Sequence, residues 1–114
     1  MYIKREIEIK KKILILLTDG PDRPVLLPSA KSVNIREGSN LGPIVCSVGC
    51  HPNCNYVWKH SRTGDSFLNI RSSQSLEIYS IKREQSGKYR CSVNHPNDTS
   101  RLNRTYVMVT VLCK

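Results

Sequence analysis

The sequence predicts an all-β fold in which two sheets pack face to face as a sandwich. From Val25 onward, short apolar runs alternate with polar residues, a pattern typical of strands that bury one face. Clusters of Gly, Pro, Asn, Asp and Ser separate these runs, and such residues favour turns. An apolar content of 39%, with one Trp, one Phe and five Tyr, suits the thin core between two sheets.

The first strand is expected to be split, because Pro28 interrupts the alternation and cannot donate to a sheet ladder. Later strands follow the alternation without interruption, so that Trp58 faces one side of its strand and Lys59 the other. A turn-rich corner is expected at residues 82–87 and a polar loop at residues 95–100. The expected strands are 25–27, 32–36, 41–47, 55–60, 67–70, 75–81, 88–94 and 104–112.

The 114 residues are expected to hold one domain, over residues 22–112. Residues 1–21 are interpreted as a leader, or as the remnant of a preceding domain with its linker. Ile7 and Ile9 alternate with charged residues there, which favours an extended segment. Two Pro and a Gly between residues 18 and 24 then predict a short, stiff connector.

Four features together resemble the immunoglobulin superfamily. Trp58 follows Cys46 after 12 positions, the run Gly87-x-Tyr89-x-Cys91 ends 33 positions after Trp58, and Leu76-Glu77-Ile78 fits the strand between them. The resemblance covers roughly residues 22–112. It is closest in kind to repeats of tandem-domain cell-adhesion or matrix proteins, hemicentin-like or carcinoembryonic-antigen-like.

The resemblance implies an immunoglobulin-like two-sheet Greek-key sandwich, with a disulfide between Cys46 and Cys91 joining its sheets. Trp58 is then expected to pack on that bridge, and Tyr89 to form the tyrosine corner. The short span from Trp58 to Cys91 leaves no room for the extra strand pair of a variable-type domain, so an intermediate-set or constant-like sandwich is expected. The resemblance also implies extracellular recognition or adhesion, without catalysis.

One position departs from the family pattern. Gln85 stands where the family usually has an Asp that pairs with a basic residue, for which Arg71 is the candidate here. An amide can accept a hydrogen bond but cannot form that ion pair. The corner is therefore expected to depend chiefly on Tyr89.

Cys50 and Cys54 are expected to form a small surface disulfide, because the Pro-containing turn between them can bring their Cα atoms within bonding reach. A zinc site from these two cysteines with Cys46 and His51 is the alternative, although structural zinc sites usually join two separate clusters. A pair of free thiols is a third possibility. Cys113 is then left over, and is either free, paired with another chain, or separated from its mate.

The compartment is expected to be extracellular or the cell surface. Five cysteines in a short chain favour an oxidising environment, and Asn97-Asp98-Thr99 and Asn103-Arg104-Thr105 are acceptor sequences for N-linked glycan. The apolar run at residues 13–17 is short for a signal peptide, and no apolar run is long enough to span a membrane. A fragment, or one module of a longer chain, is therefore expected.

Neither an enzyme nor a metal or cofactor site is expected. The chain has no nucleophile elbow, no carboxylate pair spaced for hydrolysis and no Gly-rich phosphate loop. His51, His60 and His95 do not share a helix face and are interpreted as loop histidines. Nucleic acid is not an expected partner, since no recognition helix or stacking platform is evident.

The partner is expected to be a protein, for which a second copy of the chain or a neighbouring immunoglobulin domain are candidates. The net charge is +9, of which residues 1–18 carry +3. If Trp58 points inward, a sheet face with both cations and apolar side chains points outward, and this mixture is typical of an interface. The expected partner-binding residues are Lys59, Lys88, Arg90, Tyr106 and Met108, with Val57 and Ser92 beside them.

A sulfated glycan of the heparan-sulfate type is the alternative partner, because excess positive charge also attracts polyanions. The residues expected to serve it are Lys59, Arg62, Lys82, Arg83, Lys88 and Arg90. Steep salt dependence would distinguish this alternative from protein binding through apolar contacts.

Overall fold

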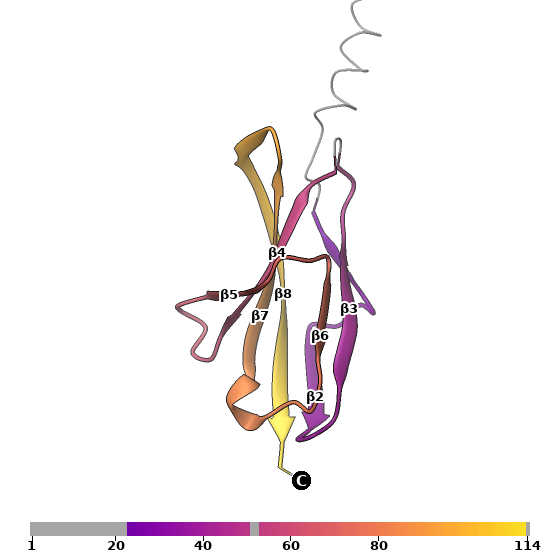
Figure 1. Ribbon diagram of the computed structural model, residues 1–114, viewed down its shortest axis with the longest axis vertical. Helices are drawn as coiled ribbons and strands as arrows, with labels where there is room; N and C mark the ends of the chain where they lie inside the picture. The colour runs from indigo at the N-terminus through magenta and orange to yellow at the C-terminus, as the bar shows by residue number, and fades with distance from the viewer. Residues whose placement is uncertain (1–22, 51–52, 114) are drawn as a thin grey trace, which may run out of the picture.

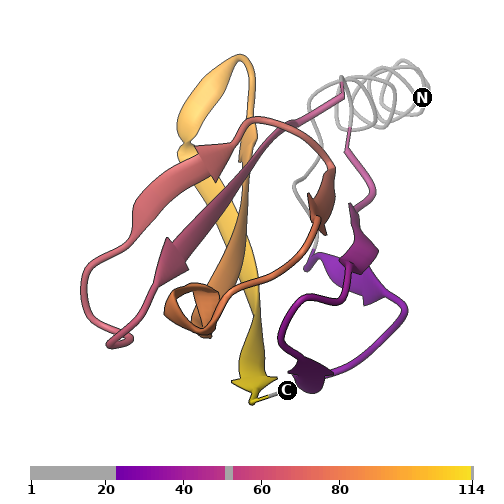
Figure 2. The same ribbon diagram turned by 60° about the horizontal axis from the view of Figure 1, so that its bottom comes forward.

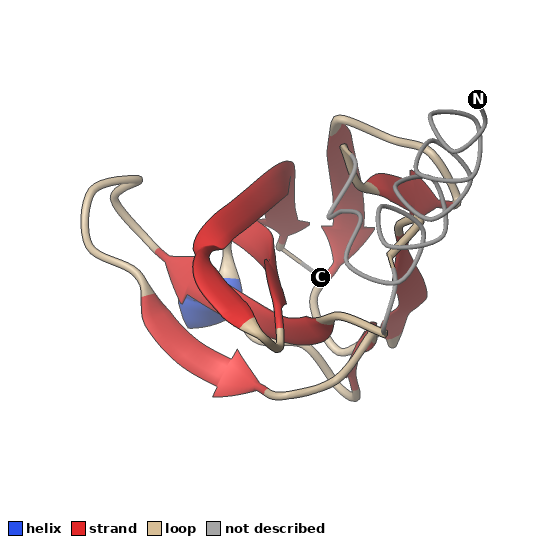
Figure 3. Cartoon of the chain, turned by 90° about the horizontal axis from the view of Figure 1, so that it is seen from above, coloured by secondary structure: helices blue, strands red, loops and turns tan. Residues whose placement is uncertain are grey.

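A computed structural model describes residues 23–50 and 53–113, and their strands form two facing sheets (Figure 1). Apart from the short 3-10 helix η1 (Arg83–Gln85), the described chain consists of strands and connecting loops (Figure 3). The predicted all-β class is therefore confirmed. The prediction for residues 1–21 lies outside the described residues, as does the histidine at position 51.

One sheet has three antiparallel strands and the other has five. The smaller sheet contains β1 (Val25–Leu27), β3 (Leu41–Ser47) and β6 (Ser75–Ile78), in the order β1-β3-β6. The larger has the order β2-β8-β7-β4-β5, with β2 parallel to β8 and the other pairs antiparallel. Its strands are β2 (Ser32–Arg36), β4 (Asn55–Ser61), β5 (Leu68–Arg71), β7 (Gly87–His95) and β8 (Asp98–Leu112).

The predicted split of the first strand is confirmed, since β1 and β2 belong to different sheets. The break falls at Pro28, directly after β1. A proline there removes a ladder donor, so the chain leaves one sheet and reaches the other by residue 32. Figure 2 shows this crossing in the indigo part of the chain.

A disulfide between Cys46 and Cys91 joins β3 to β7, and thus one sheet to the other. Their Cα atoms are 6.5 Å apart, and both side chains are fully buried. Trp58 is fully buried in the same core, with its indole Nε1 donating to the carbonyl oxygen of Gln74 at 3.1 Å. The indole thereby buries a large apolar surface without leaving its N–H unpaired.

The tyrosine corner is formed by Tyr89, whose hydroxyl donates to the backbone carbonyl oxygen of Gln85. The ring of His60 stacks on Tyr89 with centroids 4.4 Å apart, and His60 Nε2 lies 2.9 Å from the Ser86 carbonyl oxygen. The Gln85 side chain accepts from the Lys82 N–H at 2.7 Å. The amide that replaces the usual Asp therefore closes the corner locally.

Two strand boundaries differ by more than one residue from those predicted, while β4, β5 and β7 differ at their ends by one residue. β6 ends at Ile78 rather than at residue 81, because Ser80 has a φ of 50° that breaks the strand before the buried Ile81. β8 begins at Asp98 rather than at 104, so β7 and β8 form one long hairpin that extends beyond the other strands (Figure 1). A two-stranded ribbon outside a sandwich needs no apolar alternation, which explains why its sequence looked like a loop.

Candidate functional site

The candidate site is the outer face of the five-stranded sheet, meaning the face that points away from the three-stranded sheet. Trp58, Tyr89 and Val107 are buried between the sheets, so their neighbours in sequence point outward. All five residues predicted to bind a partner lie on this outer face. Met108 is 44% exposed, and the other four, Lys59, Lys88, Arg90 and Tyr106, are half-buried.

Strand pairing brings these residues together in rows across the sheet. Lys59 on β4 is opposite Arg90 on β7, and Arg90 is opposite Tyr106 on β8. Lys88 is opposite Met108 in the adjacent row. Directly opposed side chains of an antiparallel pair have Cβ atoms roughly 5 Å apart, so the five residues form one continuous surface.

Two aromatic rings hold the cations in place. The Lys88 Nζ lies 4.3 Å from the centroid of the Tyr106 ring, and the Arg90 guanidinium carbon lies 4.2 Å from the centroid of the Phe67 ring. The two rings are themselves 6.2 Å apart. Each cation–π contact at a partly exposed site contributes roughly 0.5–1 kcal/mol. These contacts therefore restrain the Lys88 and Arg90 side chains before any partner binds.

Arg104 is the second residue, after Phe67, that the sequence reasoning missed at this site. It is exposed on β8, opposite Ser92 and two residues before Tyr106. Burial by itself raises the pKa of Tyr106, but hydrogen bonds from Arg90 and Arg104, together with their positive charge, outweigh burial and lower the pKa below 10. The alternation along β8 could have indicated Arg104, since residues two apart share a face.

The term cationic cluster is used below for Lys59, Lys88, Arg90 and Arg104. Within the described residues, the only ion pair joins Arg83 to Glu37, at 3.7 Å and away from the cluster. The buried Nε of Arg90 has no hydrogen-bond acceptor there either. The positive charge of the cluster is therefore not neutralised by the parts of the domain that the structure describes.

The other residues expected on this face are less available to a partner. Ser92 is 5% exposed, so it lies beneath its neighbours, and Val57 is half-buried. Of the cations proposed for a glycan only, Arg62 lies in the turn after β4, and Lys82 and Arg83 lie at the corner before β7. Arg83 is the residue already paired with Glu37.

Cys50 and Cys54 are joined by a disulfide, with Cα atoms 5.8 Å apart. Because Cys46 is bonded to Cys91, the thiolates needed for the alternative zinc site are not available in this state. No group of three or more metal-ligating side chains occurs among the residues described. Cys113 is exposed and outside any disulfide, and Arg83 Nη1 donates to its sulfur at 3.6 Å.

The two glycan acceptor sequences lie on the β7–β8 hairpin. Asn97 is exposed in the turn between the strands. Asn103 is half-buried and is opposite Val93, which is buried between the sheets. Opposed residues share a face, so Asn103 points away from the outer face that carries the cationic cluster.

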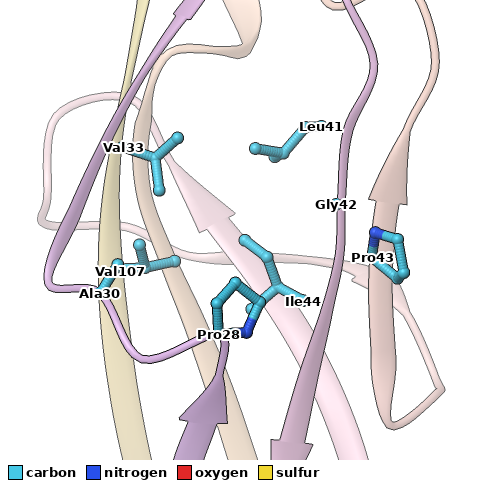
Figure 4. A pocket seen from close by; sticks show the side chains of 8 residues that line it. All are labelled: Pro28, Ala30, Val33, Leu41, Gly42, Pro43, Ile44 and Val107. Carbon is cyan, nitrogen blue, oxygen red and sulfur yellow. The ribbon is translucent and has the colours of Figure 1, made fainter.

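Hollows also lie elsewhere in the described part of the fold. An apolar cavity of about 210 Å³ opens where β1 crosses to β2, and Figure 4 shows Val33, Leu41, Ile44 and Pro28 pointing into it. Its lining residues have no acidic, basic or nucleophilic side chain. A second groove of about 400 Å³ lies between β5 and β6, and Arg71 and Glu77 are among the residues that line it.

Comparison with known proteins is consistent with this sandwich. A family model for the immunoglobulin domain matches residues 23–95. The chain is 34% identical over 88 residues to neuronal growth regulator 1 from Gallus gallus, covering 77% of this chain and 24% of that protein. It is 32% identical over 110 residues to limbic system-associated membrane protein from Rattus norvegicus, and the match covers 96% of this chain and 30% of that protein.

Among solved structures, the four N-terminal immunoglobulin domains of Dscam1 isoform 4.44 match with a TM-score of 0.63 and 21% identity, over 83% of this chain and 26% of that one. The chain thus spans roughly a quarter to a third of the curated relatives it matches. The described residues contain no helix with the length and hydrophobicity that crossing a bilayer requires. Sequence, fold and comparison agree that the chain belongs to the immunoglobulin domain family.

Proposed function

We propose that this chain is a non-catalytic recognition module on the outside of the cell, one domain of a longer adhesion or receptor protein, and that it binds a protein partner through the outer face. The observation that supports this most is the cationic cluster, in which two cations lie on aromatic rings and none forms an ion pair within the described residues. Clustered cations without ion pairs add little to the folding stability of a domain. A partner with acidic or other complementary groups would supply the contacts that the cluster lacks.

The composition of the outer face suits a protein interface. Tyr106 and Met108 provide apolar surface at its centre, while the cations around them resemble the polar rim that interfaces typically have. Tyr and Arg are also the residue types that most often carry binding energy. Because the face is built on paired strands, binding would not have to order a flexible loop.

An extracellular location is supported by the chemistry of the chain. The two disulfides persist best in an oxidising compartment, and one curated relative is by name a membrane protein. After expression through a secretory pathway behind an added signal peptide, peptide mapping should find both bridges closed and glycan on Asn97 or Asn103. A folded protein with Cys46 and Cys91 reduced and no glycan would contradict this location.

Binding through the outer face can be tested with a panel of displayed extracellular domains, this domain included. The secreted domain should be made multivalent and screened for binders. For any binder, Tyr106→Ala and Met108→Ala should each weaken binding by roughly fivefold or more, since each removes a large side chain from the proposed binding surface. The matched controls are Val25→Ala and Leu27→Ala, which shorten exposed apolar side chains of the three-stranded sheet. Equal loss in controls and outer-face variants would contradict the proposal.

A sulfated glycan remains the second candidate, because the same cationic cluster forms no ion pair within the described part of the chain. In that case heparinase treatment of the target cells should abolish binding, and binding should fall steeply between about 0.1 and 1 M salt, where the screening length shrinks from roughly 10 to 3 Å. Tyr106→Ala and Met108→Ala should then have little effect, whereas Lys88→Glu and Arg90→Glu should abolish binding.

A further inference from the structure

We propose that the outer face recognises carboxylates, so that the partner presents Asp or Glu side chains to the cationic cluster, with Arg90 and Arg104 as the central contacts. This inference rests on the proposed function and adds to it the chemistry of the partner. Arginine suits this task because its planar guanidinium can donate two parallel hydrogen bonds to one carboxylate.

The first step concerns the charges and hydrogen-bond donors of the cluster that have no partner within the described part of the domain. No cation of the cluster forms an ion pair among the described residues, although these residues include Glu37, Asp65, Glu77 and Glu84. The buried Nε of Arg90 finds no acceptor, and the guanidinium lies against the Phe67 ring. Arg90 therefore keeps one donor unpaired within the described residues, although this Nε is buried and a partner would have to meet the guanidinium through its outer nitrogens.

The second step concerns the electrostatic character of the centre. The phenol of Tyr106 is held between Arg90 and Arg104, whose hydrogen bonds and charges lower its pKa despite the opposing effect of burial. A phenol that ionises more easily than usual marks a place where negative charge is stabilised. A carboxylate placed at this position would meet the same two guanidinium groups.

The third step favours a protein over a sulfated polysaccharide. Three of the four cations, Lys59, Lys88 and Arg90, are half-buried, and two of them lie on aromatic rings. Half-buried cations extend little beyond the apolar side chains beside them. They therefore suit a protein surface that presents acidic and apolar side chains together. A sulfated chain is served better by well exposed, flexible cations, and among these four only Arg104 is exposed.

The fourth step excludes the outer face of a second copy as the occupant. A symmetric contact between two such faces would oppose one cationic cluster to another. Like charges facing each other across an interface cost several kcal/mol. Outer-face variants should therefore leave the sedimentation coefficient of the isolated domain unchanged.

The test uses the ¹⁵N-labelled full chain and a twelve-residue peptide in which Glu and Phe alternate, compared with the same peptide carrying Gln for Glu. The Glu peptide should shift the amide signals of β7 and β8 together with the Arg90 side-chain Nε–Hε signal. It should bind about tenfold more tightly than the Gln peptide, and Arg104→Gln should weaken it about fivefold. Arg71→Gln, an equal loss of charge in the groove by β6, should change its affinity by less than about twofold.

Four outcomes decide the matter, once dispersed spectra show that every variant is folded. The expected pattern supports carboxylate recognition. If both peptides bind the outer face equally, or Arg71→Gln weakens binding as much as Arg104→Gln, carboxylate recognition is wrong, while the outer face remains a binding surface. A heparin-derived octasaccharide that shifts the same signals when the Glu peptide does not would identify the ligand as a glycan. If no probe shifts the outer face and panel binding is insensitive to Tyr106→Ala, the proposed function fails as well.

Discussion

Gly42 lies in β3 with a φ of 85°, a backbone conformation that side chains rarely adopt. A Cβ atom at this position would overlap the backbone carbonyl oxygen of Leu76 on the neighbouring strand β6. Gly64 has a similar φ of 92°, but nothing lies within 4 Å of its Cβ position. Comparing substitutions at Gly42 and Gly64 therefore distinguishes the cost of backbone strain from the cost of steric overlap.

We expect Gly42→Ala to lower the free energy of unfolding by about 3 kcal/mol or more, since strain and overlap act together. Gly64→Ala should cost only about 1 kcal/mol, from the backbone strain alone. Urea denaturation of both variants measures the difference. Equal losses would show that β3 and β6 approach each other less closely at Gly42 than the structure indicates.

Tyr89 makes folding stability depend on pH in the alkaline range. Burial raises the pKa of Tyr89 to about 12, from 10.0 in the unfolded chain. Between these values the unfolded state has lost the phenolic proton and the folded state has kept it, so stability is fully present below pH 10 and falls as the pH rises toward 12. Tyr89→Phe should flatten this part of the profile, as measured by thermal melts from pH 8 to 12.

The same variant should also be less stable at pH 7, by roughly 1 kcal/mol, because the Gln85 carbonyl oxygen loses its donor. Tyr79→Phe is a suitable control, because the Tyr79 side chain is 71% exposed. An unchanged alkaline profile in Tyr89→Phe would mean that another group is responsible for the pH dependence.

At the scale of elements, the two disulfides differ in what they constrain. The Cys46–Cys91 bridge closes a loop of 45 positions and ties β3 to β7, whereas Cys50–Cys54 closes only 4 positions. In the chain-entropy model the first contributes about 4 kcal/mol and the second about 2 kcal/mol. The long bridge thus stabilises the sandwich, and the short one mainly restrains the entry to β4.

Paired substitution tests this difference. Cys46→Ala with Cys91→Ala should lower the unfolding free energy by about 4 kcal/mol, which is most of the stability of a domain at the low end of the usual range of about 5–15 kcal/mol. Cys50→Ser with Cys54→Ser should cost no more than about 2 kcal/mol and leave the near-ultraviolet signal of Trp58 intact. Similar losses from the two pairs would contradict the loop-length explanation.

The elements that the sequence predicts correctly are those whose side chains are buried between the sheets. Trp58, Tyr89 and Cys91 reveal their strands because burial of one face forces alternation. The start of β8 was not predictable, since the hairpin beyond the sandwich needs no apolar face. Phe67 was missed at the site because the turn between β4 and β5 brings it onto the outer face, and no local pattern reports that turn's geometry.

At the scale of the whole molecule, charge and architecture serve different purposes. The core between the sheets is formed almost entirely by apolar side chains, and the outer face of the larger sheet carries the cationic cluster. Asn103 points away from that cluster, so a glycan there would leave the outer face open. In the function proposed above, the inner face of the larger sheet stabilises the domain and its outer face recognises the partner.

A glycan introduced deliberately can test which face binds. Lys59→Asn creates the acceptor sequence Asn-His-Ser with Ser61 on the outer face, and Val45→Asn creates Asn-Cys-Ser with Ser47 on the three-stranded sheet. Lys59→Gln controls for the lost charge. Mass spectrometry of the secreted variants verifies that each new site is occupied.

The decisive measurement is the affinity of these glycosylated variants for a partner recovered from the panel. The Lys59→Asn glycan should abolish binding, because it covers Arg90 in the adjacent strand position, while the Val45→Asn glycan should leave the affinity unchanged within about twofold. Loss of binding with the Val45→Asn glycan, and full binding with the Lys59→Asn glycan, would contradict recognition through the outer face.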